Sequence, residues 1–409
     1  MSSKDFVYAK FSEYYNDPSL VLPAPLHLEQ REFAYLQFRE RFMVRHRRFE
    51  TIEGFQSLLK RNVPSDVYHS CAYYENPDFD MEKKGWSGAD VVFDIDADHI
   101  PTSCGKIHDE WTCQKCQFSG KGITPEECPI CEGDKFSTKI WACDQCLEST
   151  RVETAKLIDM LEKDFGFSAS ELHVFFSGHR GYHVHVEDEA VRSLDALARK
   201  EIVDYVTGLG LNLLDKEGKE KRGKRKASDK KFNLHDYGWN RRLKIGMQKF
   251  LSKASAEDLK SIGLRNNAVL KSKDAILKRC IEDGRWDSIP GVSVQTWRKL
   301  AEHVKNLESA NIDTVVTTDI HRLIRMNGTL HGKTGLLKKE FPASKLEDFD
   351  PFTEAVAFKK GTARVFVSDA PEFRLGGQTL GPYKNVTKEL PIAAAIMLIQ
   401  KGRAEVVNN

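Results

Sequence analysis

The chain has 409 residues, 40% of them hydrophobic, and a formal net charge of only +2. This length is enough for two or three modules around at least one sizeable core, and the hydrophobic content is ordinary for a globular protein. The near-neutral charge excludes any argument for nucleic-acid binding from overall charge, so such a function has to depend on local basic clusters.

No signal peptide is expected, because the N-terminus does not combine a basic start, an apolar run and a small-residue cleavage site. The most apolar late stretch, residues 390–399, contains Pro391 and is shorter than the roughly 20 residues that a membrane-spanning helix needs. This stretch predicts a buried C-terminal helix instead. We expect a cytoplasmic protein that does not associate with membranes.

Seven of the nine cysteines lie between Cys104 and Cys146, mostly as Cys-x-x-Cys pairs. A secreted disulfide framework would spread its cysteines so that they join distant elements. Short pairs in a chain without a signal peptide favour metal binding in a reducing compartment.

Near the N-terminus, leucines and phenylalanines recur among polar residues in residues 26–42. This spacing predicts a helix with one apolar side. Four arginines follow within residues 41–48, and we interpret them as the solvated basic end of that helix.

Residues 89–97 alternate β-branched and aromatic side chains with aspartates, which predicts a strand. A period of two puts Asp94 and Asp96 on the same face, about 7 Å apart along the strand. Two carboxylates this close are costly unless a cation neutralises them, and Mg²⁺ prefers oxygen ligands. Asp-x-Asp alone is a weak signal for a metal site, and the apolar strand around it strengthens that signal.

The next elements predicted are a helix over residues 150–165, a strand over 172–176, a glycine-rich turn over 177–181 and a returning strand over 182–186. Glycines expose backbone N–H groups to anions, and Arg180 can donate two hydrogen bonds to a phosphate. An ordinary hairpin with a basic tip is the alternative. We favour phosphate binding, because the turn holds more donors than a hairpin needs.

A basic loop is predicted at residues 216–231, which hold nine lysines and arginines against three acidic residues. This loop could contact the phosphates of a nucleic acid or be a solvated loop without a ligand. Residues 250–308 are polar and predict a helical subdomain. Strand signals return from residue 311, where Asp313 is expected on a strand before a basic, glycine-containing segment at residues 325–333.

Residues 104–146 offer eight metal ligands, and their Cys-x₂-Cys-x₁₁-Cys-x₂-Cys spacing is typical of a zinc ribbon. A nested division puts Cys113, Cys116, Cys128 and Cys131 in one site and Cys104, His108, Cys143 and Cys146 in the other. A sequential division, 104/108/113/116 and 128/131/143/146, fits the spacing equally well. Four protein ligands leave no open position, so we expect one or two structural zinc ions without a catalytic role.

Three stretches resemble, in order, the signature motifs of the small subunit of archaeo-eukaryotic DNA primases. They are Phe-Asp-Ile-Asp at residues 93–96, Ser-Gly-His-Arg-Gly-Tyr-His at 177–183, and Leu-Ile-Arg with Leu-His-Gly-Lys at 323–333. Residues 31–33, 43–46 and 389–396 are also similar to the family, so the resemblance spans nearly the whole chain.

The resemblance implies an α/β (α+β) fold, with mixed or antiparallel sheets flanked by helices, an inserted zinc-binding module and a helical subdomain. We expect an N-terminal part of the catalytic domain with the Asp-x-Asp strand (1–103), a zinc-binding insertion (104–146), a catalytic part with the glycine-rich turn (147–215), a basic loop and helical subdomain (216–310), and a catalytic part with the third carboxylate and the C-terminal helix (311–409).

The resemblance also implies roles for individual residues. Asp94, Asp96 and Asp313 match the metal-binding aspartates, and Asp313 lies 18 residues before His331 as the family requires. Asp319 is a nearer competitor, which we interpret as structural. The positions that match the family's nucleotide site are Ser177, Arg180, His183, Arg325, His331, Lys333 and Arg31. Arg325 replaces a lysine of eukaryotic relatives and keeps the positive charge, although arginine and lysine differ in geometry.

The implied activity is template-directed nucleotidyl transfer with Mg²⁺ or Mn²⁺, which makes short primers on single-stranded DNA for replication. The implied partners are a primase large subunit in a heterodimer, the DNA template, NTPs with dNTPs as an alternative, and the replicative polymerase or helicase machinery. Relatives place one zinc site just before the helix near Thr150, which favours the nested division. The rival hypotheses are a stand-alone primase-polymerase, an end-joining polymerase module, and a zinc-ribbon protein without catalysis.

Overall fold

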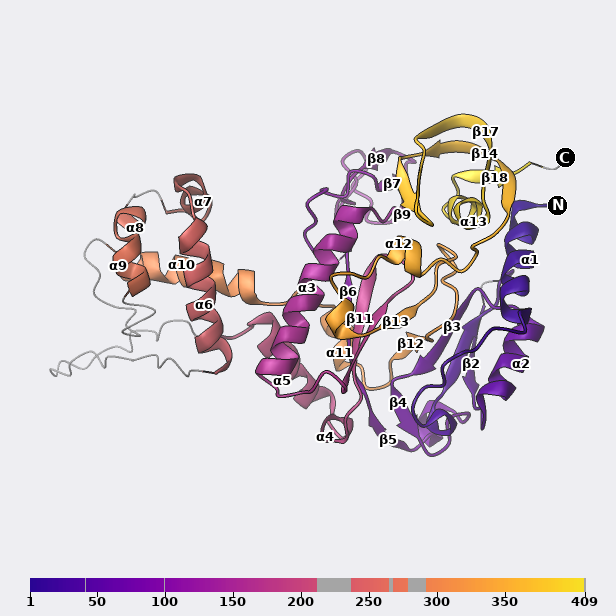
Figure 1. The fold of residues 1–409 in the computed structure, drawn as a ribbon, viewed down its shortest axis with the longest axis horizontal. Helices are drawn as coiled ribbons and strands as arrows, with labels where there is room; N and C mark the ends of the chain where they lie inside the picture. Colours follow the sequence, from indigo (N-terminus) through magenta and orange to yellow (C-terminus); the bar gives the residue numbers. More distant parts are fainter. Residues whose placement is uncertain (41, 99, 212–236, 265–267, 279–291, 408–409) are drawn as a thin grey trace. The chain divides into compact units, whose positions relative to one another are not determined.

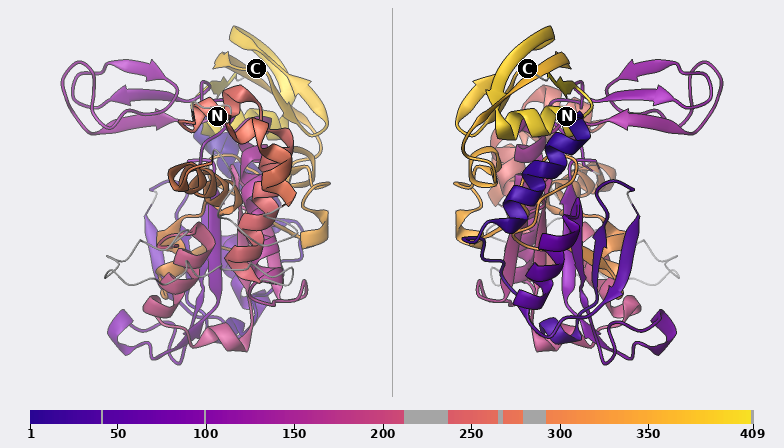
Figure 2. Two further views of the ribbon diagram at one scale, coloured as in Figure 1. Left: turned by 90° about the vertical axis from the view of Figure 1, so that its left-hand side faces the viewer. Right: turned by 90° about the vertical axis from the view of Figure 1, so that its right-hand side faces the viewer.

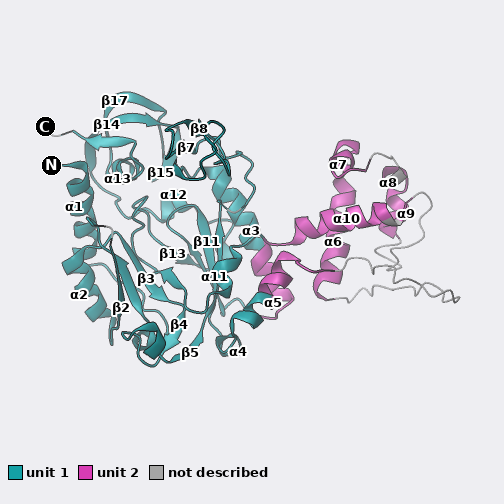
Figure 3. Cartoon of the chain, turned by 180° about the vertical axis from the view of Figure 1, so that it is seen from behind, with its two compact units in different colours: residues 1–155, 168–200, 311–409 teal, residues 156–167, 201–310 magenta. Residues whose placement is uncertain are grey.

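The structure is a computed structural model that describes residues 1–40, 42–98, 100–211, 237–264, 268–278 and 292–407 (Figure 1). It divides into unit 1, residues 1–155, 168–200 and 311–409, and unit 2, residues 156–167 and 201–310 (Figure 3). The predicted basic loop 216–231 lies outside the described residues. None of the helices in the described ranges is long and apolar enough to cross a membrane.

The first sheet of unit 1 has the strand order β12-β3-β1-β2, and its neighbouring strands pair antiparallel. Its strands are β1 (Phe33–Leu36), β2 (Met43–Arg47), β3 (Asp66–Ser70) and β12 (Leu323–Arg325). The helices whose buried side chains join its core are α1 (Ser3–Asn16), α2 (Ile52–Asn62) and α13 (Ile392–Gln400). The predicted C-terminal helix is confirmed as α13, which is buried over most of its length.

The helix predicted over residues 26–42 is wrong. This region holds a short 3₁₀ turn, η1 (Leu28–Gln30), and then strand β1. Strand β1 pairs on both sides, with β2 and β3, so hydrogen bonds between distant segments override the helical spacing of the apolar residues. Two of the arginines expected at a helix end, Arg45 and Arg47, lie on β2, whose side chains are alternately exposed and half-buried at the edge of the sheet.

The second sheet of unit 1 has the order β13-β10-β11-β6. Its strands are β6 (Val91–Asp96), β10 (Leu172–Phe176), β11 (Gly181–Val186) and β13 (Lys339–Phe341). The predicted strands at 89–97, 172–176 and 182–186 are therefore confirmed to within one or two residues. The predicted helix at 150–165 is part of α3 (Asp144–Lys163).

The strand expected around Asp313 is wrong, because residues 314–318 form the short helix α11 (Thr314–Thr318). The Asp313 carboxylate caps this helix by accepting the Val315 N–H at 3.0 Å. Val316 then packs with Cys71, Val92 and Ile324 in a buried cluster. Burial and capping here outweigh the strand preference of the valines.

The remaining elements of unit 1 surround these two sheets. They are β4 (Ala72–Tyr74), η2 (Met81–Lys83), β5 (Trp86–Ala89), β7 (Glu110–Cys113), β8 (Ser119–Lys121), β9 (Phe136–Lys139), α4 (Glu189–Arg192), η4 (Ala343–Lys345), α12 (Pro351–Glu354), β14 (Thr362–Ala370), β15 (Phe373–Leu375), β16 (Gln378–Leu380), β17 (Tyr383–Pro391) and β18 (Ala404–Val406). Figure 2 shows β7, β8 and β9 standing away from the other strands of unit 1.

Unit 2 is helical in its described part, as the sequence predicts for residues 250–308. Its helices are α6 (Gly238–Lys253), α7 (Ala256–Ser261), α8 (Ala268–Lys271), α9 (Lys273–Lys278) and α10 (Val294–Glu308), with the end of α5 (Ala196–Thr207). Arg242 of α6 is buried and forms ion pairs with Asp159 and Asp164, which ties α6 to the end of α3.

Candidate active site and metal-binding groups

Three carboxylates from two distant parts of the sequence come together at the β6 edge of the second sheet. Asp94 and Asp96 lie two residues apart on β6 and are half-buried, and the backbone N–H of Asp313 donates to the backbone carbonyl of Asp94 at 2.8 Å. Burial raises the pKa of Asp94 to about 7, and the negative charges of Asp96 and Asp313 contribute to this shift. A bound cation would relieve both effects, and oxygen ligands of this kind suit Mg²⁺ or Mn²⁺.

His183 lies directly opposite Asp94 in the β11–β6 pairing, with 3.7 Å between its Nε2 and the Asp94 carboxylate. Its side chain is buried, and burial holds its pKa well below the usual value. The Nδ1 atom has no hydrogen-bond partner within the described residues. The ring is therefore held neutral beside the carboxylates, with a polar atom left for a ligand.

The glycines of the glycine-rich turn are required by close backbone contacts. A Cβ at Gly181 would lie 2.1 Å from the carbonyl oxygen of Ile95 on the neighbouring strand. Gly178 has a φ of +86°, and a Cβ there would lie 3.0 Å from the Cβ of His331. Glycine thus lets this turn approach both β6 and the segment at residues 325–333. The Thr334 hydroxyl joins the two by donating to the Gly178 carbonyl at 2.6 Å.

Arg180 at the end of this turn is surrounded by carboxylates. Its side chain is only 3% exposed and forms ion pairs with Asp96 at 2.9 Å, with Asp109 at 3.7 Å and with Asp98. Burial lowers its pKa, against the opposing effect of Asp96. In this arrangement the guanidinium neutralises the carboxylates that would otherwise repel one another.

A buried aspartate that the sequence analysis did not single out holds the basic segment in place. Asp66 of β3 accepts from Arg325 at 2.6 Å and from the Gly332 N–H at 2.9 Å. Burial alone would raise the pKa of Asp66, but Arg325 and the Gly332 N–H lower it. In the same segment, the His331 ring stacks on the His179 ring with 5.0 Å between their centroids. Lys333, two residues further along the chain, is exposed.

Arg31 has a different environment from the other predicted nucleotide-binding residues. Its side chain is completely buried and forms an ion pair of 2.7 Å with Asp90. It also donates to the Tyr73 hydroxyl at 2.8 Å and to the backbone carbonyls of Leu26, Ser70 and Cys71. The guanidinium of Arg31 is therefore engaged by partners within unit 1.

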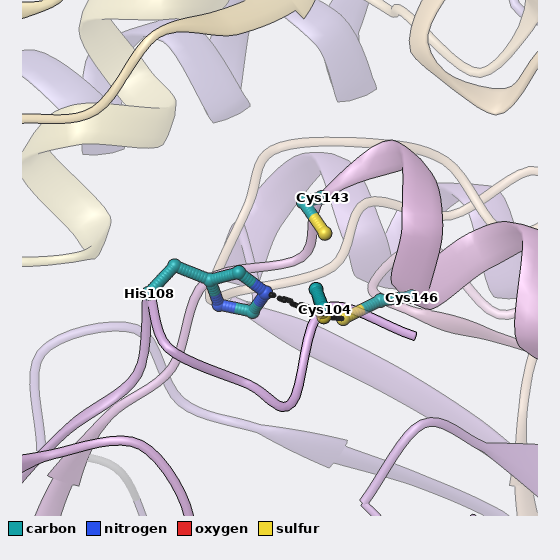
Figure 4. A group of neighbouring side chains, drawn as sticks. All are labelled: Cys104, His108, Cys143 and Cys146. Carbon is teal, nitrogen blue, oxygen red and sulfur yellow. Dashed lines mark hydrogen bonds between the residues drawn. The ribbon is translucent and has the colours of Figure 1, made fainter. Parts of the chain in front are cut away.

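The insertion holds two groups of metal-binding side chains. The first is Cys104, His108, Cys143 and Cys146 (Figure 4), and the second is Cys113, Cys116, Cys128 and Cys131. Within each group, the ligand atoms lie within 4.8 Å of one another. This is the nested grouping, and the sequential one is not what the structure brings together.

The spacing inside each group fits tetrahedral zinc. Zinc–sulfur bonds of about 2.3 Å place two sulfurs roughly 3.8 Å apart in a tetrahedron. The Cys104–Cys146 sulfurs are 3.5 Å apart, and the Cys113–Cys131 and Cys116–Cys128 sulfurs are each 3.6 Å apart. The cysteines of the described residues are free thiols, so they are available as ligands.

Asp109 connects the first of these groups to Arg180. Its carboxylate lies 2.9 Å from His108 Nδ1 and accepts the Trp141 N–H at 2.9 Å, while its other oxygen pairs with Arg180. A carboxylate that orients a metal-binding histidine is a common feature of zinc sites. Because Asp109 directly follows His108 in the sequence, its role in orienting that histidine could have been predicted. No sequence pattern indicates its ion pair with Arg180.

Comparisons with known proteins identify the class. A family model described as DNA primase small subunit matches residues 137–342, which include the glycine-rich turn, Asp313 and the basic segment. The DNA primase small subunit PriS of Methanococcoides burtonii is 32% identical over 425 residues, covering 99% of each chain. The corresponding proteins of Cenarchaeum symbiosum and Halobacterium salinarum are 31% and 30% identical, covering 99% and 98% of each chain. The chain belongs to the DNA primase small subunit family.

Proposed function

We propose that this chain is the catalytic subunit of a DNA primase that makes short primers from NTPs on single-stranded DNA for replication. The observation that carries the proposal is the meeting of Asp94, Asp96 and Asp313 beside the glycine-rich turn and the basic segment. Three carboxylates next to several cationic or neutral hydrogen-bond donors suit a nucleoside triphosphate with its divalent cations.

Asp94, Asp96 and Asp313 would hold the divalent cations. Bound there, Mg²⁺ or Mn²⁺ would lower the pKa of a 3′-hydroxyl and stabilise the charge that develops at the α-phosphate. The 3′-oxygen would form a bond to the α-phosphorus, and its proton would pass to water. The bond between the α-phosphorus and the oxygen that bridges to the β-phosphate would break, which releases pyrophosphate.

The cationic and neutral donors would bind the triphosphate. Arg180, now paired with Asp96, would exchange that carboxylate for a phosphate oxygen once the nucleotide and its cations bind. His183 and His331, held neutral by burial, can donate to phosphate oxygens, and the exposed Lys333 would add a positive charge. Together these residues would stabilise the charge on the leaving pyrophosphate. Ser177 would contribute a hydroxyl, and Arg325 would act through its ion pair with Asp66.

The two groups of the insertion would each hold a structural zinc ion, since four protein ligands leave no position for a substrate. His108 would be oriented by Asp109 as a ligand of the first ion. The domain boundaries expected from the sequence, with a zinc-binding insertion at 104–146 and a helical subdomain within 216–310, belong to the same proposal.

The chain would work with a large subunit, a DNA template and the replicative polymerase or helicase machinery. The test is synthesis from NTPs on unprimed single-stranded DNA, with and without a large subunit. Products that start without a primer would support the proposal. Synthesis only from a preformed primer, even with the large subunit, would favour an end-joining type of polymerase, and binding of DNA without any synthesis would favour a protein without catalysis.

A further inference from the structure

A second basic site lies next to the candidate active site, in unit 1. It is a pocket between α13, the end of β9, the glycine-rich turn and the basic segment. Its lining includes Lys4, Lys139, His179, Lys333 and Lys401, and none of its described lining residues is an aspartate or a glutamate. Four lysines and a histidine around one hollow, without an acidic partner in its lining, favour a ligand with several negative charges.

Lys401 is held at this pocket by two contacts with the insertion. Its Nζ donates to the Ile140 carbonyl at 2.8 Å and lies 5.4 Å from the centre of the Trp141 ring. Burial lowers the pKa of Lys401 to about 7, and the nearby positive charge of Arg180 contributes. The positive charges therefore repel one another in the absence of an anion.

His179 supplies a second, independent observation. The residue is only 8% exposed, it lines the pocket, and its ring nitrogens have no hydrogen-bond partner in the part of the chain that the structure describes. Its ring is fixed by stacking on His331. A fixed imidazole in the lining of the pocket, with its ring nitrogens not engaged by other side chains, can hydrogen-bond a ligand there.

We infer that this pocket binds the pyrophosphate ion released by nucleotidyl transfer, an inference that rests on the proposed function. The pocket includes Gly332 and Lys333 of the basic segment, so it adjoins the residues proposed to bind the triphosphate. Pyrophosphate that leaves the α-phosphorus would pass from His331 and Lys333 to Lys401, Lys139 and His179. The β- and γ-phosphates of an intact NTP carry the same kind of oxygens, so the pocket could bind either free pyrophosphate or the NTP. The experiment below distinguishes these two ligands.

The test compares the full chain with its Lys401→Met and Lys139→Met variants. Lys139 is exposed, so its loss leaves the fold intact even if Lys401→Met does not. Pyrophosphate binding is measured by calorimetry, and inhibition of primer extension by added pyrophosphate is measured alongside the KM for NTP. Lys384→Met, an exposed lysine on β17 outside the pocket, is the matched control.

Loss of a charged partner should weaken pyrophosphate binding by about tenfold in either pocket variant, with the KM for NTP changed by less than about twofold. The Lys384→Met variant should behave as the wild type. Unchanged pyrophosphate affinity in both pocket variants would overturn the inference. A KM for NTP that rises as much as the pyrophosphate dissociation constant would also overturn it, because the pocket would then hold the substrate. A wild-type chain without polymerase activity would contradict the proposed function instead, and calorimetry would still decide the pocket.

Discussion

The backbone N–H of Asp313 donates to the backbone carbonyl of Asp94 at 2.8 Å, across more than two hundred residues of sequence. This bond fixes the start of α11 against β6, so the Asp313 carboxylate approaches the pair on β6 through rigid backbone rather than through a flexible loop. Preorganisation of this kind suits a metal site, whose ligands have to be held close together against their mutual repulsion.

The first prediction concerns pH. Burial, with Asp96 and Asp313, raises the pKa of Asp94 to about 7 in the metal-free protein, so Asp94 has to lose its proton when a cation binds. Mn²⁺ affinity should therefore rise as the pH increases through about 7 and level off above it. Between about pH 4 and 7 the folded state binds more protons than the unfolded chain. The free energy of unfolding of the metal-free protein should therefore fall as the pH rises from about 4 to 7.

Calorimetry of Mn²⁺ binding in two buffers of different ionisation enthalpy measures the protons released. Release at pH 6 that disappears at pH 8.5 is expected from the Asp94 pKa of about 7. Equal affinity and no proton release at pH 6 would contradict the shared carboxylate site. Asp319→Asn is the matched control, because Asp319 accepts the His321 N–H at the other end of α11 and should leave metal binding unchanged.

The second prediction concerns the division of the zinc ligands. The nested grouping predicts that a Cys104→Ser, Cys146→Ser double variant loses one zinc ion and that a Cys104→Ser, Cys116→Ser double variant loses both. The sequential division predicts the opposite for each pair. Zinc content of the purified variants, measured by atomic emission, decides between them, and one ion in the wild type would exclude both divisions.

The third prediction concerns Asp109, which lies 2.9 Å from His108 and 3.7 Å from Arg180. Loss of a carboxylate that supports a metal-binding histidine typically weakens metal binding about 10–100-fold. Asp109→Asn should therefore lose zinc to a chelator faster than the wild type and should also raise the KM for NTP, because Arg180 loses a partner. Asp134→Asn, an exposed residue of the same insertion, should change neither. Normal zinc retention with a raised KM would limit Asp109 to the contact with Arg180.

The fourth prediction concerns Arg31, which resembles a family position near the nucleotide but is buried against Asp90. Arg31→Met would leave Asp90 buried without its partner, which typically costs about 3–5 kcal/mol in the free energy of unfolding. Urea unfolding measures this loss. A variant of unchanged stability with a higher KM for NTP would show that Arg31 acts on the nucleotide and not on packing.

Local patterns were enough to predict β6, β10, β11 and α13, because each buries a continuous apolar run or alternates on one face. The region at 26–42 was mispredicted because β1 is a strand held on both sides by pairing, and one of its partners, β3, lies about thirty residues further along the chain. A helix and a short strand present similar apolar spacing over a few residues, and only the pairing decides between them.

The candidate site was predictable where its residues follow each other in sequence and unpredictable where a distant partner defines them. Asp66 and Arg325 are 259 residues apart, so their ion pair has no local signal. The zinc ligands were recognisable from their spacing, but their grouping depends on the pairing of β7 with β9, which brings Glu110 opposite Lys139. That pairing closes the insertion and brings its two ends together.

The most direct test of the central claim is primer synthesis on unprimed single-stranded DNA by the chain with its large subunit, comparing the wild type with an Asp94→Asn, Asp96→Asn double variant. Substitution of a residue that only supports a metal ligand typically reduces metal affinity or activity about 10–100-fold. The loss of two direct ligands should therefore reduce dinucleotide formation by more than about a hundredfold. Circular dichroism should show an unchanged fold, because burial disfavours the charge of Asp94 and because Arg180 keeps Asp98 and Asp109 as partners when Asp96 is changed. Dinucleotide synthesis near the wild-type rate in a folded double variant would contradict the account.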